Sequence, residues 1–216
     1  MSEIWYRTLR QSVEDGDPDA VAEGVRAALA DGLSPLDIIH KALVPGLDSV
    51  GEQYARGEMF LPDLVLAGEA MKAAMAILEP MLRDRGLQRE TLGRVVLGTV
   101  RGDIHEIGKT LVGTLLAANG FEVHDLGVDV PPERFAEKAA EVGAQIVGAS
   151  ALLTTTMVGQ RDVILALERA HLRPTVKVMV GGAPVTPGWA REIGADGYAA
   201  DAVAAVALAR RLVGVG

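Results

Sequence analysis

The chain has 216 residues, of which 49% are hydrophobic, and its formal net charge is −8. This is enough apolar material for a buried core, and an acidic chain lacks the basic surface that nucleic-acid binding needs. The absence of cysteine excludes disulfides, cysteine-ligated zinc, iron–sulfur clusters and thiol nucleophiles. Because Met1–Trp5 shows no signal-peptide pattern and no apolar run reaches about 18 residues, we expect a cytoplasmic protein with no membrane partner.

Residues 1–87 are predicted to form a helical cap domain. Val21, Val25 and Leu29 repeat at the spacing of one helical face, and Ser34-Pro35 is typical of an N-cap followed by the first helical turn. Short turns between helices favour antiparallel packing, so we predict a four-helix bundle. The predicted helices are Ser2–Glu14, a helix from Asp17 to Gly32, a helix from Ser34 to Arg56, and one that starts at Pro62.

Residues 88–93 are predicted to be a linker, and residues 94–216 alternate between strand and helix patterns. Such alternation specifies an α/β domain with a parallel sheet covered by helices on both faces. The predicted strands are Arg94–Val100, Glu122–Leu126, Gln145–Ala149, Val176–Val180 and Gly197–Ala199. The predicted helices are Ile107–Ala118, Glu133–Val142, Thr155–Ala170, Pro187–Ile193 and Asp201–Val213. Five strands suit the flavodoxin-like (Rossmann-like) order 2-1-3-4-5.

That strand order predicts a site at the carboxyl ends of the strands. Ligands of such sheets bind where the strand order reverses, between the first and third strands. The loop after the first strand carries Asp103 and His105, and the loop after the third carries the run from Ser150 to Thr156. The loop after the fourth strand, Gly181–Pro184, is expected beside them. Three unusual loops are therefore predicted to converge on one crevice.

The pair Asp103 and His105 indicates a histidine-to-metal bond. A metal-bound imidazole usually donates its other N–H to a carboxylate, and Asp-x-His places both groups on one short loop. Each of these features also has a plain structural interpretation: a surface histidine, a packing glycine at Gly108, an N-cap in the Ser150–Thr156 run, and a turn at Gly181-Gly182. His40, His124 and His171 are interpreted as structural or surface residues.

Taken together, these motifs resemble the three-part signature of cobalamin-binding domains. The signature is carried by Asp103-x-His105-x-x-Gly108, Ser150-x-Leu152 and Gly181-Gly182. The helical region with its turn Glu58-Met59-Phe60-Leu61-Pro62 resembles the cap domain of the same family. The chain is most similar to the stand-alone corrinoid proteins of methylamine-type methyltransferase systems, and more distantly to the cobalamin module of methionine synthase.

The resemblance implies a role for each motif. His105 would be the lower axial ligand of cobalt, with Asp103 bonded to it and Thr156 extending the relay. The nucleotide tail of the cofactor would lie along Ser150, Leu152, Thr154, Gly181, Gly182 and Tyr198. Met59, Phe60 and Leu61 would cover the upper face. The cofactor would be cobalamin or a related corrinoid, cycling between methylcobalamin and the Co(I) form.

The implied function is a methyl carrier with no catalytic activity of its own. It would pass a methyl group from a substrate-specific methyltransferase to a methyl-acceptor methyltransferase, with a reductive activase as a further partner. A cobalamin sensor, a flavodoxin-like module for a flavin or phosphoryl group, and a fragment of an adenosylcobalamin mutase are the alternatives. The methyl donor and the oligomeric state are left open by the sequence.

Overall fold

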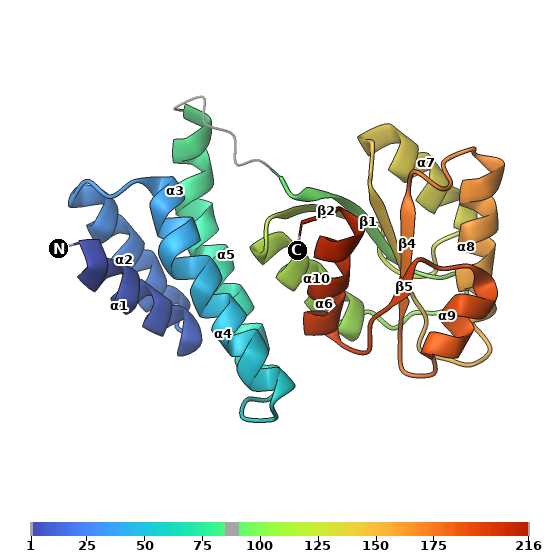
Figure 1. Ribbon diagram of the computed structural model, residues 1–216, viewed down its shortest axis with the longest axis horizontal. Coiled ribbons are helices and arrows are strands. Elements are labelled where there is room, and N and C mark those ends of the chain that lie inside the picture. The colour runs from blue at the N-terminus through green and yellow to red at the C-terminus, as the bar shows by residue number, and fades with distance from the viewer. Residues whose placement is uncertain (1, 85–90, 216) are drawn as a thin grey trace. The chain divides into compact units, whose positions relative to one another are not determined.

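The computed structural model describes residues 2–84 and 91–215 and divides the chain into two compact units, Met1–Glu90 and Thr91–Gly216 (Figure 1). The predicted linker over 88–93 lies partly outside the described residues. Its described part is bonded to the second unit, because Leu92 N–H donates to the carbonyl of Gly120 and the first strand begins at Gly93.

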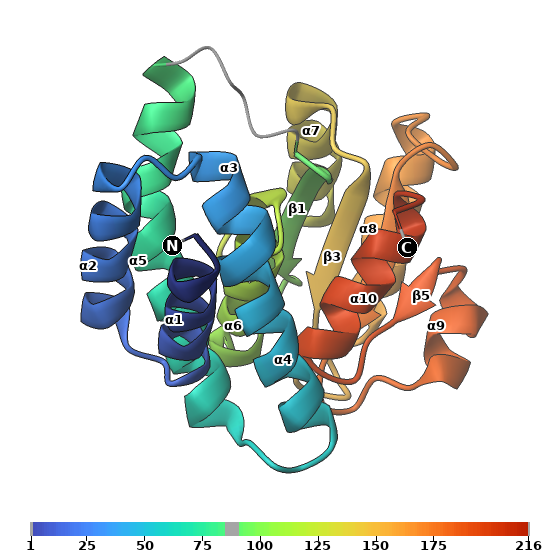
Figure 2. The same ribbon diagram turned by 60° about the vertical axis from the view of Figure 1, so that its left-hand side comes forward.

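The first unit is helical, and its helices lie side by side as a bundle (Figure 2). Asp17 caps the second helix by accepting from the N–H groups of Asp19 and Ala20, and Pro18 occupies the first turn. Buried side chains along the helices, including Leu9, Val25 and Leu78, fill the space between them. The elements are α1 Ser2–Glu14, α2 Pro18–Ala30, α3 Pro35–Ile38, the π-helix η1 Ile39–Leu43, α4 Val44–Ala55 and α5 Leu61–Asp84.

The third predicted helix differs from the observed structure in two respects. It begins at Pro35 as expected, but the Ser34 side chain makes no capping hydrogen bond among the described residues. Its middle is the π-helix η1, in which the N–H of Val44 donates to the carbonyl of Ile39. Pro45 explains the change, because it has no N–H for the carbonyl of Lys41 and its ring crowds that carbonyl.

The second unit contains a five-stranded sheet in which every strand pair is parallel, in the order β2-β1-β3-β4-β5. This is the predicted order, and each predicted strand overlaps an observed one. Thr99 pairs with Ser150, and Ser150 pairs with Gly181, so the carboxyl ends of three strands are neighbours. The strands are β1 Gly93–Thr99, β2 Phe121–Asp125, β3 Ile146–Ser150, β4 Lys177–Gly181 and β5 Gly197–Tyr198.

Helices cover both faces of this sheet (Figure 1). Val96, Val147 and Val178 face a core closed by α7, α8 and α9, whereas alternate residues such as Leu97 and Met179 are buried on the face of α6 and α10. The helices are α6 Ile107–Ala118, α7 Pro132–Val142, α8 Val158–Arg169, α9 Pro187–Ile193 and α10 Ala202–Leu212. The prediction placed the start of α8 at Thr155, but Thr154–Met157 form a turn before it.

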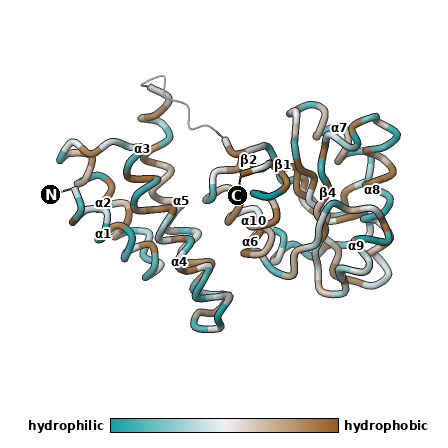
Figure 3. Tube along the Cα trace, viewed as in Figure 1, coloured by the Kyte–Doolittle hydropathy of each residue, from teal (hydrophilic) through white to brown (hydrophobic). Residues whose placement is uncertain are grey.

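Hydropathy follows this layering. The strands are mostly hydrophobic, whereas the helices alternate between hydrophobic and hydrophilic residues (Figure 3). Among the described residues, no helix has both the length and the apolar character needed to cross a membrane.

Gly182 marks the place where the loop after β4 passes closest to the loop after β3. Its φ is +128°, and a Cβ atom there would lie 1.8 Å from the carbonyl oxygen of Ala151. Gly194 also has a positive φ, +78°, but a Cβ atom there would meet nothing within 4 Å. The first glycine is therefore required by both backbone conformation and space, and the second by conformation alone.

We predict that Gly182→Ala destabilises the second unit far more than Gly194→Ala. The control substitution should cost about 1 kcal/mol, the ordinary penalty of a left-handed residue with a side chain. Gly182→Ala should cost about 3 kcal/mol or more, because a backbone atom must also move. Calorimetric unfolding of the two variants measures the difference, and equal melting temperatures would contradict this account of the loop.

Candidate functional site

The sheet brings the three predicted loops together at its carboxyl edge. Residues 100–106 follow β1, residues 151–157 follow β3, and residues 182–186 follow β4. Hydrogen bonds join them: the N–H of Leu152 donates to Asp103, and the N–H of Ala151 donates to the carbonyl of Gly181. The predicted convergence of these loops is therefore present in the structure.

Asp103 accepts hydrogen bonds from two of the three loops at this edge. Its side chain is fully buried, at 0% exposure. One carboxylate oxygen, Oδ1, accepts from the backbone N–H of His105 at 3.1 Å and faces Nδ1 of the same residue at 2.6 Å. The other, Oδ2, accepts from Leu152 N–H at 2.7 Å, from Leu153 N–H at 3.4 Å and from the Thr156 hydroxyl at 2.7 Å. The carboxylate thus ties the loop after β1 to the loop after β3.

His105 is held at one ring nitrogen and open at the other. A carboxylate facing Nδ1 keeps the proton on that nitrogen, so the lone pair of the neutral ring lies on Nε2. The side chain is 45% exposed although its partner is fully buried. Its carbonyl accepts from the buried hydroxyl of Thr99 at 2.9 Å, which fixes the backbone as well. The imidazole can therefore offer one oriented lone pair to a metal.

The surroundings of Asp103 keep it ionised. Burial by itself favours the neutral acid, but the hydrogen bonds from Thr156, His105 and Leu152 outweigh it and hold the pKa of Asp103 well below its ordinary value of 3.8. A lasting negative charge beside Nδ1 fixes the tautomer and the orientation of the His105 ring.

The backbone before His105 has anchors that the sequence analysis did not identify. The N–H of Gly102, a residue with φ +81°, donates to the carboxylate of Asp129 at 2.7 Å, and the N–H of Asp129 donates to the carbonyl of Asp103 at 2.9 Å. The buried Thr99 at the end of β1 and Asp129 in the loop after β2 are weak signals in the sequence, because both bind main-chain groups rather than side chains of a motif.

Gly108 has open space beside it. A Cβ atom at this position would meet nothing within 4 Å, which removes close packing as the reason for a glycine. The next residue, Lys109, is buried and forms an ion pair with Asp125 at the end of β2, so the first turn of α6 is anchored. Large apolar side chains nearby are exposed: Ile104, Ile107, Leu152 and Leu153 at 74%, 81%, 41% and 43%. The start of α6 thus has open space, and the two loops joined by Asp103 expose apolar surface.

The other predicted cofactor residues belong to three parts of the chain. The hydroxyls of Ser150 and Thr154 form no hydrogen bond with any described residue, and both lie at the edge that carries Asp103. Tyr198 packs against the core beneath α7, α8 and α9, and within the described part of the chain no hydrogen bond joins its side chain to Asp103. In the helical unit, Phe60 and Leu61 are 68% and 44% exposed, and Met59 is partly buried.

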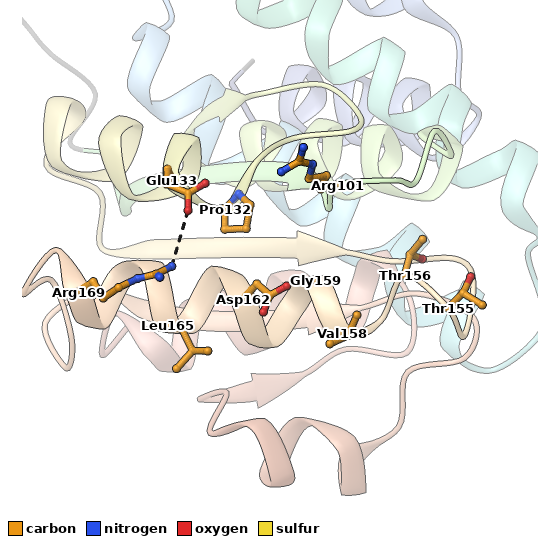
Figure 4. A pocket seen from close by; sticks show the side chains of 10 residues that line it. All are labelled: Arg101, Pro132, Glu133, Thr155, Thr156, Val158, Gly159, Asp162, Leu165 and Arg169. Carbon is orange, nitrogen blue, oxygen red and sulfur yellow. Dashed lines mark ion pairs between the residues drawn. The ribbon is translucent and has the colours of Figure 1, made fainter.

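A cleft of about 370 Å³ opens between the start of α7 and the side of α8 (Figure 4). Thr156 belongs to its wall together with Arg101, and an ion pair of 3.7 Å between Glu133 and Arg169 crosses it. His105 does not line the cleft. The cleft therefore reaches the outer end of the hydrogen-bonded chain Thr156–Asp103–His105, and the imidazole lies at the other end.

The donor set bears on the kind of metal that fits. Within residues 2–84 and 91–215, no group of three or more His, Asp or Glu side chains is placed to hold a metal ion, and the chain has no cysteine. A bare ion needs several protein ligands. A single oriented imidazole suits a metal whose remaining ligands arrive with it, as in a macrocycle.

Comparison with known proteins agrees with this conclusion. Residues 93–207 match the family described as B12 binding domain, and residues 5–79 match a second family with the same description. A corrinoid protein of Desulfitobacterium hafniense is 49% identical over 207 residues, covering 95% of this chain and 96% of the relative. Dimethylamine corrinoid protein 2 of Methanosarcina acetivorans is 51% identical, covering 84% of this chain and 83% of the relative.

A solved structure shows the same architecture. The methanol:cobalamin methyltransferase complex of Methanosarcina barkeri contains a chain that aligns with a TM-score of 0.85 and 30% identity, covering 98% of this chain and 80% of that one. The chain therefore belongs to the B12-binding corrinoid proteins, the family that the sequence motifs had indicated. The predicted fold, a helical bundle followed by a five-stranded parallel α/β domain, is confirmed.

We predict that Asp103→Asn destabilises the chain in a pH-dependent way. At pH 7 the amide cannot accept on both sides, so about 2 kcal/mol should be lost. Because the pKa of Asp103 is lowered by folding, its charge stabilises the wild type fully above the ordinary pKa of 3.8. This stabilisation disappears as pH falls through the lower folded value, so the difference between the two proteins should shrink below 3.8.

The measurement is the melting temperature of both proteins between pH 7 and acidic pH. Asp162→Asn is the matched control, since no hydrogen bond or ion pair joins the Asp162 side chain, in α8, to another described residue. A difference between wild type and Asp103→Asn that stays constant as pH falls would show that the charge of Asp103 does not contribute.

Proposed function

We propose that this chain is the methyl-carrying corrinoid subunit of a methyltransferase system, with His105 as the lower axial ligand of cobalt. The observation that carries the proposal is an imidazole whose Nδ1 faces a buried carboxylate at 2.6 Å while its side chain remains 45% exposed. Relatives named as dimethylamine and trimethylamine corrinoid proteins, and a neighbour named as a methyltransferase complex, support the methyl-transfer role.

The residues around His105 fit a flat macrocycle. Gly108 leaves open space at the start of α6, and Ile104 and Leu152 expose apolar side chains that a flat, largely apolar ring would cover. When bound, a corrinoid supplies a cobalt ion that accepts and releases a methyl group. The protein supplies one ligand, a shaped surface and control of the ligand's proton.

In this proposal Asp103 controls the proton of His105. With the proton on Nδ1, the Nε2 lone pair is available as a ligand. When His105 is not a ligand, Nε2 can take up a proton, and the resulting positive charge lies beside a carboxylate that stays ionised. Thr156 donates to the other carboxylate oxygen and keeps Asp103 in place during that change.

The nucleotide tail of the cofactor is proposed to lie along the loops after β3, β4 and β5. The hydroxyls of Ser150 and Thr154, which have no hydrogen-bond partner among the described residues, are available to a polar ligand, and Leu152 offers exposed apolar surface. Gly182 brings the β4 loop close to that of β3, because a Cβ atom there would collide with the backbone of Ala151. At Gly181 a Cβ atom would lie 3.1 Å from the carbonyl oxygen of Ala199, which follows β5. Tyr198 is retained as a tail contact from the resemblance alone.

The helical unit, residues 1–87, is proposed to be the cap, joined by a linker at 88–93. Its exposed turn, Met59, Phe60 and Leu61, would cover the methyl-bearing face of the cofactor. Phe60, Leu61 and Val65, which are 68%, 44% and 41% exposed, would supply the apolar surface for that contact.

The chain is proposed to depend on partners for catalysis. A substrate-specific methyltransferase would load the methyl group, a methyl-acceptor methyltransferase would remove it, and a reductive activase would restore the cofactor after oxidation. Identity to dimethylamine and trimethylamine relatives, 51% and 45%, supports a methylamine as the donor. The expected cytoplasmic location and the absence of nucleic-acid and membrane partners remain predictions from the sequence.

The function is tested by following an isotope-labelled methyl group. Cobalamin-loaded chain is mixed with labelled methylamines, with and without a methyltransferase from the same source, and is then separated by gel filtration. We expect label on the chain only when the methyltransferase is present. Label acquired equally without it would contradict the carrier role, and absence of label with every methylamine would exclude this donor class.

His105→Ala tests the proposed ligand in the same preparation. Its loaded form should lose the part of the cobalamin absorbance spectrum that depends on a histidine ligand, and it should carry less label. His40→Ala is the control, because His40 is an exposed histidine of the helical unit. Identical spectra for wild type and His105→Ala would overturn the assignment.

Gly108→Leu tests the space reserved for the ring. Because a side chain at this position meets no protein atom near its Cβ, we expect an unchanged or slightly higher melting temperature, as replacing a helical glycine by leucine favours the helix by about 0.5 kcal/mol. Cobalamin affinity, measured by equilibrium dialysis, should fall at least about tenfold, a cost of about 1.4 kcal/mol. The cobalamin affinity of Gly108→Ala should lie between that of the wild type and that of Gly108→Leu.

A further inference from the structure

Asp129, in the loop between β2 and α7, has an unusual backbone conformation. Its φ is +53°, in the left-handed region that residues with a side chain rarely adopt. Such a residue persists only where its surroundings compensate for the strain, and strained residues gather at functional sites. The compensation here comes from the loop that carries His105.

Two hydrogen bonds join Asp129 to that loop. Its carboxylate accepts from the N–H of Gly102 at 2.7 Å, and its own N–H donates to the carbonyl of Asp103 at 2.9 Å. These are the residues immediately before Ile104 and His105. Asp129 is therefore bonded to the backbone segment that positions Asp103 and His105.

The end of β1 is also bonded to the loop that carries Asp129. Val130 pairs with Val100 in an isolated parallel bridge, and the N–H of Val130 donates to the carbonyl of Thr99 at 3.0 Å. The hydroxyl of Thr99 in turn holds the carbonyl of His105 at 2.9 Å. The loop with the histidine is thus fixed from the β2 side by Asp129 and from the β3 side through the carboxylate of Asp103.

We infer that Asp129 is a positioning residue for His105: it fixes the backbone of Gly102 and Asp103 so that Nε2 meets cobalt without further ordering. A metal–imidazole bond is demanding in distance and direction, so a loop ordered beforehand favours the bound state. Asp129 acts through main-chain atoms, since no hydrogen bond joins its side chain to the imidazole within the described residues. The inference rests on the proposed role of His105.

The test separates backbone conformation from the hydrogen bond. Asp129→Gly tolerates a positive φ but removes the acceptor for Gly102 N–H. Asp129→Asn keeps an amide oxygen as acceptor, and asparagine tolerates this conformation. His171→Gly is the control, because His171 has a similar φ of +56° and lies after the end of α8, outside the loops at the carboxyl edge.

Each protein is made with nitrogen-15 in its histidines and loaded with cob(II)alamin. Electron paramagnetic resonance then distinguishes cobalt bound to a histidine nitrogen from cobalt bound to the cofactor's own base. We expect the ratio of histidine-bound to unbound cofactor to fall about tenfold in Asp129→Gly, the effect of about one lost hydrogen bond. Asp129→Asn and His171→Gly should match the wild type, and the melting temperature of apo Asp129→Gly should stay close to it.

The outcomes are distinct. An unchanged histidine-bound fraction in Asp129→Gly overturns the inference, as does an equal loss in His171→Gly. If Asp129→Gly does not fold in buffer alone, all the proteins are measured in a stabilising osmolyte with the same expected loss, and a wild-type fraction there also overturns the inference. Wild-type protein without a histidine signal shows instead that the proposed function is wrong, because His105 then does not bind cobalt.

Discussion

The buried carboxylate of Asp103 is the constraint on which the rest of the site depends. Removing a charge from water costs several kcal/mol unless hydrogen-bond donors replace the water. Here five donors do so, two from His105 and three from Leu152, Leu153 and Thr156. The last three belong to the loop after β3. The charge can therefore be satisfied only when β1 lies beside β3, so the strand order and the state of the site are linked.

This arrangement explains why a partly exposed histidine can have a defined chemistry. A free surface imidazole exchanges tautomers and orientations, whereas His105 is held at Nδ1 by a carboxylate with no exposed surface and at its carbonyl by Thr99. Most of the ordering cost is met by groups in the protein interior. The His105 side chain nevertheless remains 45% exposed, and Gly108 and exposed apolar side chains such as Ile104 lie within three residues of it in sequence. The Nδ1 side of the ring is thus held rigidly by the protein, while the side chain as a whole stays accessible to a ligand.

The sequence predicted most of the fold because periodicity and alternation are strong signals. The bounds of α6 and α9 agree with the prediction, and so does the strand order. Local chemistry explains the misses: Pro45 converts a helical turn into η1, and the Ser/Thr run delays α8 to Val158. Asp103 and His105 could be found because they are two residues apart. Thr99 and Asp129 could not, because they act through main-chain contacts that only the folded loops create.

The glycines of the two predicted motifs have different physical explanations. Gly182 is required by the fold, because a side chain there would collide with the backbone of Ala151. Gly108 has no such reason, since its surroundings are empty, and a helical glycine lowers stability. The adjacent Ile107 is 81% exposed, a second local choice that weakens rather than favours the isolated domain. Positions that break local rules without compensation in the fold are expected where a ligand binds. The structure thus separates two glycines that look alike in the sequence, because Gly182 has a reason within the fold and Gly108 has none.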